Sequence, residues 1–498
     1  MVWVAGGADG VPHPAGTETP MTLRTDALAA SIRYEGSARS LRLDAATAET
    51  LAPFEGTSAS SGDGYVLTGP LTTANATALQ AALPCLRPQL ISHHRTSVGT
   101  GDRTGLATPG QARAFATAGT GVMPVLAQQS IREMDRLGRS ARSVMDDAVF
   151  GLVEAGWDRG FGADCDHIKT TEGIDRGLEA GFVMFTLDPG DLVADVTAGV
   201  TAADAEALPW DQLEDSLEDL RRRYAGMTLD VGRTQIEVTE QDVLIAAVKY
   251  GRAVVEAMRL FRHATGAAQQ EIEIEIAVDE TAWETTLFEH YYLASELRRL
   301  GASWSSFAPR YVDGFEKGVE FRGDVEELRS NLEAHHAIAE QFGGYKISLH
   351  TGSDKFSIYP LCVEATEGLV HLKTSGTSYL CGLEVVAAHD EELFSRIWGV
   401  SRASYAQARA SYQVSAHEDR TPASLEGVDL LELIRSEDAR QILHVGYGDS
   451  LNATDPSGIP LHERFLSVVA AHQERHSEVL AAHLGRHLTA FAGAPAMR

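Results

Sequence analysis

The feature that most constrains the fold is a regular alternation of short apolar segments and amphipathic helical patterns that begins near residue 96. Strands that alternate with helices favour a parallel sheet, because each helix carries the chain back to the edge where the next strand starts. Eight such strands are enough to close a (β/α)8 barrel. The eight strand-like segments are GLATPG (105–110), MPVLAQQS (123–130), GFGADCDHIK (160–169), GFVMFTLD (181–188), IEIEIAVDE (272–280), ASWSSFAP (302–309), YKISLHTG (345–352) and LVHLKTSG (369–376).

Helix ends agree with this pattern. Two of the intervening helical patterns end at Gly301 and Gly343, and glycine is the usual residue just after a helix C-terminus. We therefore predict an α/β fold in which residues 93–390 form a (β/α)8 TIM-like barrel. A doubly wound open sheet is the alternative.

The segments outside this pattern differ in composition. Residues 1–22 are rich in Gly, Pro and Thr, which predicts a flexible tail. Residues 23–92 mix short strand-like pieces with one helical run, so we expect a small N-terminal appendage. Residues 190–240 are acidic and polar and follow the fourth strand, where a long insertion often forms a cap. Residues 391–498 are helical in pattern.

Composition excludes several classes of protein. The 498 residues carry a net charge of −28, and such a field repels nucleic acid and anionic lipid. The sequence contains no run of about 18 apolar residues, the length that spans a bilayer, and no basic, then apolar, secretory signal at its start. Its four cysteines are far apart and form no CxxC, which is typical of reduced thiols. We predict a cytoplasmic protein that binds neither nucleic acid nor a membrane, and leave its oligomeric state open.

Polar residues gather at the carboxyl ends of the predicted strands. In a barrel these ends meet at one rim, where catalytic residues lie. We therefore expect an active site there; an ion-pair network around the mouth is the alternative. The residues are Asp102, Arg103, Gln128, Gln129, Ser130, Asp164, Asp166, His167, Lys169, Asp188, Asp279, Glu280, Arg310, His350, Asp354, Lys355, Lys373 and Thr374.

The fifth strand has an alternating pattern. Its isoleucines alternate with Glu271, Glu273 and Glu275. Because successive side chains of a strand point to opposite faces, the glutamates would point into the barrel, near its lysines. An edge strand with one face in water would show the same alternation.

A metal site is predicted at this rim. His167, Glu280 and His350, with Asp166 or Asp279 nearby, offer the mixed nitrogen and oxygen ligands that zinc, nickel or manganese accepts. No HxH or HExxH spacing is present, so hydrogen-bonded core histidines are an equal alternative. The sequence also lacks GxSxG, GxGxxG and P-loop motifs, which argues against serine hydrolysis and a tightly bound nucleotide.

The remaining rim residues suit a small polyhydroxylated acid. Arginine and lysine bind carboxylates, while glutamine amides and hydroxyls suit sugar hydroxyls. Lysine is rare, at Lys169, Lys249, Lys317, Lys346, Lys355 and Lys373, so a lysine at a strand end is a candidate for function. The predicted substrate-binding residues are Gln128, Gln129, Lys169, Arg310, Asp354, Lys355 and Lys373.

A series of motifs resembles one enzyme family. GDRTGLATPG, AQQSIREM, GADCDHIKT, VDET, APRYV, FEKGV, SLHTGSDKFSIYP and GLVHLKTSGTSYL occur in this order over roughly residues 95–450. Together they resemble the tagaturonate epimerase family, also described as tagaturonate/fructuronate epimerases. The resemblance implies a barrel enzyme that interconverts D-tagaturonate and D-fructuronate by inversion at C4, with a divalent metal.

Inversion at C4 of a 2-keto sugar acid, whose carboxylate is at the other end of the chain, has a chemical difficulty. C4 is β to the ketone, so its hydrogen is not acidic. Cleavage of C3–C4, rotation of the aldehyde and re-addition would invert C4, given an electrophile on the C2 oxygen and an acid and base near C4. Asp166, Asp188 and Glu280 are the candidate acid and base. An aldolase that releases the fragments, a non-catalytic sugar-acid-binding protein and an enzyme of neutral ketoses remain alternatives.

Overall fold

The computed structural model of the protein describes residues 21–92 and 95–493. Most of the predicted flexible tail, residues 1–20, therefore lies outside the described residues.

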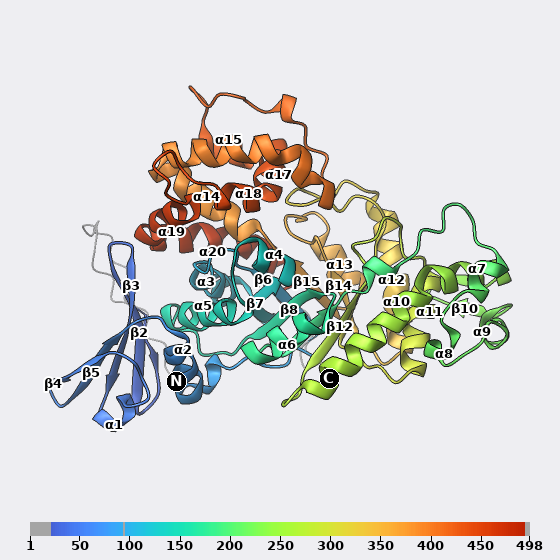
Figure 1. The fold of residues 1–498 in the computed structure, drawn as a ribbon, viewed down its shortest axis with the longest axis horizontal. Coiled ribbons are helices and arrows are strands. Elements are labelled where there is room, and N and C mark those ends of the chain that lie inside the picture. Colours follow the sequence, from blue (N-terminus) through green and yellow to red (C-terminus); the bar gives the residue numbers. More distant parts are fainter. Residues whose placement is uncertain (1–20, 93–94, 494–498) are drawn as a thin grey trace.

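The centre of the molecule is a closed barrel of eight parallel strands (Figure 1). The strands are hydrogen-bonded around the barrel in the order β12-β13-β14-β15-β6-β7-β8-β9. This confirms the (β/α)8 prediction and excludes the open sheet. The barrel strands are β6 (Thr96–Gly101), β7 (Met123–Ser130), β8 (Gly162–Ile168), β9 (Met184–Leu187), β12 (Glu273–Ala277), β13 (Ser306–Ala308), β14 (Lys346–Leu349) and β15 (Val370–Thr374).

The first predicted strand is wrong. GLATPG (105–110) forms a turn and the first residues of helix α3 (Thr108–Ala118), where Pro109 suits a helix start. The true first strand, β6, reads TSVGTG and has one large apolar residue, so its pattern is weak. Gly99 is required there, because a Cβ atom at this position would lie 1.5 Å from the Gln128 side-chain oxygen on β7.

Helices surround the barrel and cover the outer face of its strands. Thr170 and Thr286 each accept a hydrogen bond from a first-turn amide and so cap α6 and α11. α11 and α12 end two residues before Gly301 and Gly343, which confirms the predicted glycines at the helix C-termini. Both glycines have a positive φ. These helices are α3, α4 (Ile131–Arg136), α5 (Ala141–Glu154), α6 (Thr171–Ala180), α10 (Glu240–Ala267), α11 (Leu287–Arg299), α12 (Val325–Gln341), α13 (Tyr359–Ala365) and α14 (Thr377–His389).

The N-terminal part forms an antiparallel sheet at one side of the barrel (Figure 1). The Tyr34 hydroxyl on β2 donates to Glu154 on α5 at 2.9 Å, and the Thr73 hydroxyl donates to Asp146 at 2.6 Å. These bonds attach the sheet to the barrel layer. Its elements are β1 (Leu23–Arg24), β2 (Leu28–Glu35), β3 (Ala38–Ala45), α1 (Ala48–Leu51), β4 (Thr57–Ser61), β5 (Gly64–Gly69) and α2 (Thr73–Ala82).

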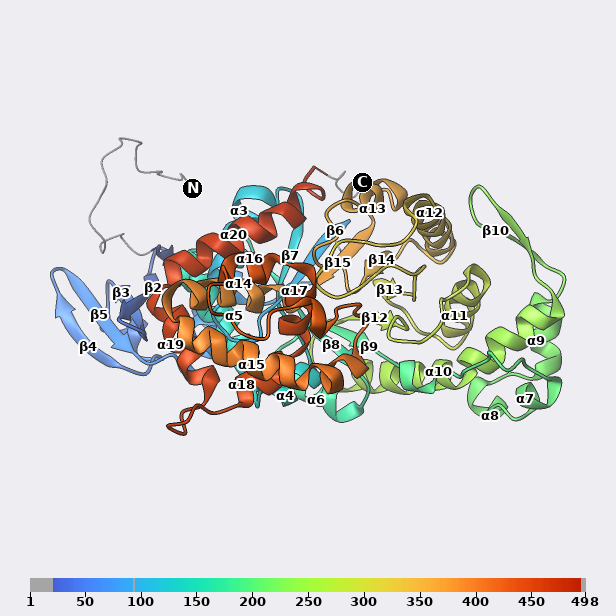
Figure 2. The same cartoon turned by 90° about the horizontal axis from the view of Figure 1, so that it is seen from above.

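The insertion after β9 lies beside the outer parts of α10 and α11 (Figure 2). Arg223 of this segment pairs with Glu296 on α11 at 2.7 Å, which fixes it to the helix layer. Its function as a cap stays a prediction, as do the domain boundaries. The insertion contains α7 (Ala202–Glu206), α8 (Trp210–Leu213), α9 (Leu217–Tyr224), β10 (Thr228–Asp230) and β11 (Gln235–Glu237).

The C-terminal helices pack on one another and on the barrel (Figure 1). They have a core of their own, which includes Phe394, Trp398 and Phe465, while α20 runs along α3. Across residues 21–92 and 95–493, no helix is long and apolar enough to cross a membrane. The C-terminal helices are α15 (Glu391–Ala408), α16 (Leu430–Arg435), α17 (Glu437–Val445), α18 (Tyr447–Asn452), α19 (Leu461–Ala471) and α20 (Gln473–Thr489).

Candidate active site

A pocket of about 50 Å³ opens at the carboxyl ends of the barrel strands. Its wall combines strand-end residues with residues of the following loops and of the C-terminal region. The wall residues are Arg103, Gln128, Ser130, Arg132, Glu133, Asp166, His167, Glu280, Lys317, His350, Thr351, Ser353, Lys373, Ser375, Tyr412 and His444.

Lys373 on β15 points into the barrel and is surrounded by carboxylates. Its Nζ lies 2.8 Å from Asp164, 2.7 Å from Asp166 and 2.6 Å from Glu275. Burial disfavours its charge, but the carboxylates outweigh burial and hold the pKa of Lys373 well above its usual value. Lys373 is therefore a fixed cation that neutralises part of an acidic centre, and a protonated amine is no nucleophile. Glu275 points inward, as predicted for the acidic face of the fifth strand, whereas Glu271 precedes β12 and is exposed.

His350, just after β14, is held between two carboxylates. Its Nε2 lies 2.8 Å from Glu275 Oε1, and its Nδ1 lies 2.9 Å from Asp279 Oδ1. Burial would lower the pKa of His350, but the negative charge of Asp279 and Glu275 raises it to about 9. The ring is thus hydrogen-bonded at Nε2 and lies at ion-pair distance from Asp279 at Nδ1.

His167, at the end of β8, has a left-handed backbone with φ of 46°. This conformation is costly for a residue with a side chain and is found often at functional sites. Its Nδ1 is 3.0 Å from Asp188 Oδ2, and Asp188 in turn accepts a hydrogen bond from the Gly190 amide at 2.8 Å. Asp188 therefore orients the imidazole of His167 toward the pocket.

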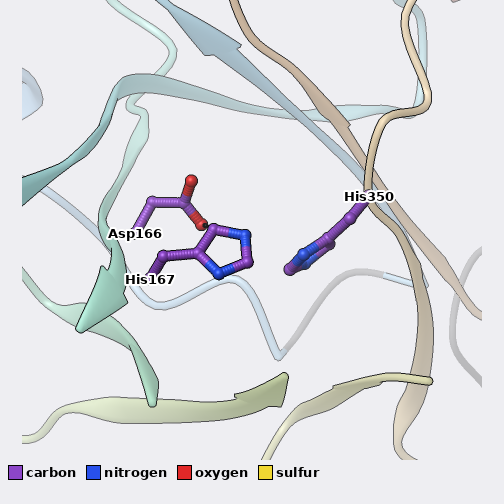
Figure 3. A group of neighbouring side chains, drawn as sticks. All are labelled: Asp166, His167 and His350. Carbon is purple, nitrogen blue, oxygen red and sulfur yellow. Dashed lines mark ion pairs between the residues drawn. The ribbon is translucent and has the colours of Figure 1, made fainter. Parts of the chain in front are cut away.

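Asp166, His167 and His350 face one another in the pocket (Figure 3). One potential ligand atom from each residue lies within 4.8 Å of the others. The two imidazoles meet edge to face with ring centroids 4.9 Å apart. Two imidazoles and a carboxylate are a ligand set that divalent transition metals accept.

A second possible ligand group contains His167, Asp188 and Glu280. Glu280, however, is bound through both oxygens by the Arg132 guanidinium, at 2.6 and 3.0 Å. Despite burial, the charges of His167 and Arg132 hold the pKa of Glu280 below its usual value. The predicted ligands His167 and His350 are thus neighbours, while Glu280 is already paired with an arginine.

The pocket wall also contains basic residues. The buried Arg103 guanidinium donates to Glu133 at 2.7 and 2.9 Å and to the His444 carbonyl at 3.1 Å. It also lies 3.6 Å from the centre of the Tyr447 ring, a cation–π contact. Lys317 lines the same pocket and donates to the Thr351 hydroxyl at 2.7 Å.

The structure brings six of the sequence-predicted site residues into the pocket wall: Gln128, Asp166, His167, Glu280, His350 and Lys373. Three others lie behind it. Asp188 holds His167, Lys169 pairs with Asp191 at 2.5 Å and approaches Asp188 at 3.7 Å, and Gln129 donates to Glu133 at 2.7 Å.

Three predicted substrate ligands lie elsewhere. Arg310 donates to Gln413 at 2.7 Å, and Asp354 pairs with Arg440 at 2.8 Å. The Lys355 ammonium donates to three backbone carbonyls, those of Glu316, Ser353 and Val319. None of the three belongs to the pocket wall, because each side chain is engaged by the contacts just named.

Several pocket residues were missed from the sequence. Arg132 and Glu133 lie in the motif AQQSIREM, and Lys317 is one of the rare lysines, so signals for them existed. Tyr412 and His444 come from the C-terminal region, and no local pattern connects them with the barrel mouth.

The sequence matches the model of the tagaturonate epimerase family over residues 32–491. A tagaturonate/fructuronate epimerase from Thermotoga maritima is 36% identical over 417 residues, covering 81% of this chain and 84% of that protein. The native crystal structure of a fructuronate-tagaturonate epimerase from Cohnella laeviribosi is 28% identical, covers 95% of both chains and superposes with a TM-score of 0.86. A one-glycerol complex of the same epimerase gives a TM-score of 0.85 with the same identity and coverage.

Proposed function

The chain belongs to the tagaturonate epimerase family, and on this premise we propose that it interconverts D-tagaturonate and D-fructuronate with a divalent cation held at the barrel mouth. The observation that carries the activity is the match to this family over residues 32–491, which includes the whole barrel and most of the C-terminal helices. The enzyme is thus an isomerase that epimerises a sugar acid.

Asp166, His167 and His350 fit a cation such as zinc, nickel or manganese. A ligating histidine usually has its second ring nitrogen held by a carboxylate. His167 meets this condition, since Nδ1 is held by Asp188 and Nε2 lies 4.0 Å from Asp166. His350 has carboxylates at both nitrogens, so either can be the supporting one. Arg132 contacts both carboxylate oxygens of Glu280, whereas Lys373 contacts Asp166 through Oδ1, and this favours Asp166 as the carboxylate ligand.

When bound, the cation would supply the electrophile that draws electron density from the C2 oxygen. Breaking C3–C4 also requires a base for the C4 hydroxyl. Asp166 and Glu280 both line the pocket. Burial raises the pKa of a carboxyl group. The positive charge of Lys373 outweighs burial at Asp166, and that of His167 outweighs it at Glu280, so the pKa of each carboxyl lies below its usual value. Both are ionised at neutral pH, but their lowered pKa values make them weaker bases than a free carboxylate. Because Asp166 is assigned to the cation, Glu280 is the group left to accept the hydroxyl proton and return it after re-addition to the other face.

The activity test is direct. Purified protein is incubated with D-tagaturonate, and fructuronate is followed by NMR before and after chelation and metal reloading. We expect turnover that chelation removes and the cation restores. A protein that makes no fructuronate would refute the substrate, and one that is fully active after chelation would refute the metal.

Deuterium at C4 tests the retro-aldol route. Cleavage of C3–C4 leaves the C4 hydrogen on its carbon, so fructuronate formed from [4-²H]tagaturonate keeps the label. Direct proton exchange at C4 would lose it to water. Release of three-carbon fragments without re-closure would instead identify an aldolase.

A further inference from the structure

The pocket wall contains cations as well as carboxylates. Arg103, Lys317 and Lys373 line it together with Asp166 and Glu280. Burial first, and then the positive charges of Arg103 and Lys317, keep the pKa of His444, another wall residue, well below its usual value. Which of these cations is still available for an anion depends on how each is already paired.

Most cations in the pocket wall are already neutralised. Arg103 pairs with Glu133 at 2.7 Å, and Arg132 pairs with Glu280 at 2.6 Å. Lys373 is shared among three carboxylates. Lys317 differs, since within the described part of the chain its ammonium makes no ion pair and its hydrogen-bond partner is the Thr351 hydroxyl at 2.7 Å. An ammonium has three donors, so Lys317 keeps donors for an anion.

The backbone around Lys317 is fixed on every side. The Lys355 ammonium donates to the Glu316 and Val319 carbonyls, both at 2.6 Å. Arg440 Nε donates to the Gly318 carbonyl at 2.9 Å, and the Lys317 amide donates to the Gln413 carbonyl at 3.1 Å. The rare Lys355 thus acts on the loop and not on the substrate. Because the loop backbone is already fixed, binding of an anion by Lys317 loses little backbone entropy.

We propose that Lys317 binds the carboxylate of the sugar acid and so selects an acid over a neutral ketose. This inference rests on the proposed function and deepens it. The Lys317 ammonium donates to the hydroxyl of Thr351, the residue that follows His350. An acid bound at Lys317 therefore also lies beside the loop that carries His350.

The test compares an acid with its neutral counterpart. Lys317→Met, Lys317→Arg and the control Arg322→Met are assayed on D-tagaturonate and on D-tagatose. Arg322 is in the same loop but pairs with Glu437 at 2.7 Å and with Glu316 at 3.7 Å, all outside the pocket wall. Loss of a charge-assisted bond predicts that Lys317→Met lowers kcat/KM for tagaturonate by about 30-fold, mainly through KM. Activity on tagatose and all values for Arg322→Met should stay within about threefold, and arginine should recover part of the loss.

Two kinetic outcomes would overturn the inference. A Lys317→Met enzyme that keeps the wild-type preference for the acid has lost no carboxylate contact. One that loses activity on both substrates equally shows that Lys317 does not discriminate between an acid and a neutral ketose.

A binding measurement tests the role of Lys317 separately from the proposed epimerase activity. Calorimetry with D-galactonate, a sugar acid without the ketone, needs no turnover. We expect the wild type to bind it and Lys317→Met to bind it at least about tenfold more weakly. Equal binding by the two proteins, or no binding by the wild type, overturns the role of Lys317 whether or not tagaturonate is turned over.

Discussion

Two clusters of one aspartate and two histidines occur in the described residues, and only one of them belongs to the pocket. Asp166, His167 and His350 line the barrel mouth, whereas Asp354, His483 and His487 join the loop after β14 to helix α20. In each, potential ligand atoms lie within 4.8 Å of one another. Residue type and spacing therefore do not distinguish a metal site from a structural contact.

Charge balance is the first difference. Around the pocket cluster, Lys373 is shared by three carboxylates, and Asp188 and Asp279 add two more beside the histidines. Negative charge remains for a cation to neutralise. In the second cluster, Asp354 is matched by the Arg440 guanidinium at 2.8 Å. A cation there would meet an arginine and no surplus carboxylate.

The second difference is where the histidine lone pairs point. His487 Nε2 accepts a hydrogen bond from the Asp354 amide at 3.0 Å, while Nδ1 faces the His483 carbonyl at 3.2 Å. Its lone pair is therefore committed. His167 Nε2 has no hydrogen-bond partner among the described residues and points toward Asp166. We infer that the second cluster is a clamp that fixes the loop behind His350.

The largest expected difference between the clusters is in turnover. Asp166→Asn removes a carboxylate from the pocket but leaves Asp164 and Glu275 to hold Lys373. We expect kcat for tagaturonate to fall by about 1000-fold with the fold retained, because the variant loses a carboxylate proposed to hold the cation that would stabilise the developing charge. Asp354→Asn is the matched control and should lose no more than about tenfold. Steady-state kinetics with circular dichroism measure both, and near-normal turnover by Asp166→Asn would contradict the assignment.

The next largest expected difference between the two clusters is in the amount of metal ion that variants of each cluster bind. Chelated protein is reloaded with zinc, nickel or manganese, desalted and analysed for bound ion. We expect about one ion per chain for the wild type and for His487→Ala, and a loss of at least tenfold in affinity for His167→Ala. If His487→Ala lost the ion instead, the two clusters would exchange roles.

The sequence predicted the barrel because its signal is repeated. Seven of the eight predicted strand segments overlap observed strands, and the one failure is β6, whose TSVGTG pattern contains two glycines. Gly99 is needed there because Gln128 of the next strand fills the space. Such a requirement is set by a neighbour and leaves no apolar pattern in the strand itself.

The site was predictable where strand geometry alone aims the side chain. His167, His350 and Lys373 lie in or directly after strands, and all three line the pocket. Asp354 and Lys355 lie further into a loop, and their direction depends on residues far along the chain, such as Arg440 and His483. No local pattern encodes contacts of this kind, which is also why His444 was missed.

A smaller effect is expected from breaking the clamp. Asp354→Asn leaves the Arg440 guanidinium, in a side chain only 12% exposed, without its carboxylate. Removing one partner of a buried pair costs about 3 kcal/mol of unfolding free energy. Urea denaturation of Asp354→Asn, Arg440→Met and the double variant measures this cost, and we expect the double variant to lose less than the sum. A stability loss below about 0.5 kcal/mol for Asp354→Asn, the range of ordinary surface changes, would argue against a clamp.

The smallest expected effect is on how steeply the free energy of unfolding falls as the pH is lowered. Arg440 first, and then His483 and His487, outweigh burial and hold the pKa of Asp354 well below its ordinary value of 3.8. The unfolded chain then binds more protons than the folded chain as pH falls through this range, so the contribution of Asp354 is present above about pH 4 and lost below it. Burial lowers the pKa of His487 below its usual 6.5. As pH falls through about 6.5, the histidine takes up a proton in the unfolded chain before it does so in the folded chain, so the protein begins to lose the contribution of His487 to the free energy of unfolding at this higher pH. Urea titrations from pH 7 to pH 3 should therefore show a shallower fall below pH 4 in Asp354→Asn and a shallower fall from about pH 6.5 in His487→Gln. Parallel curves for the wild type and both variants would show that the clamp does not contribute to acid sensitivity.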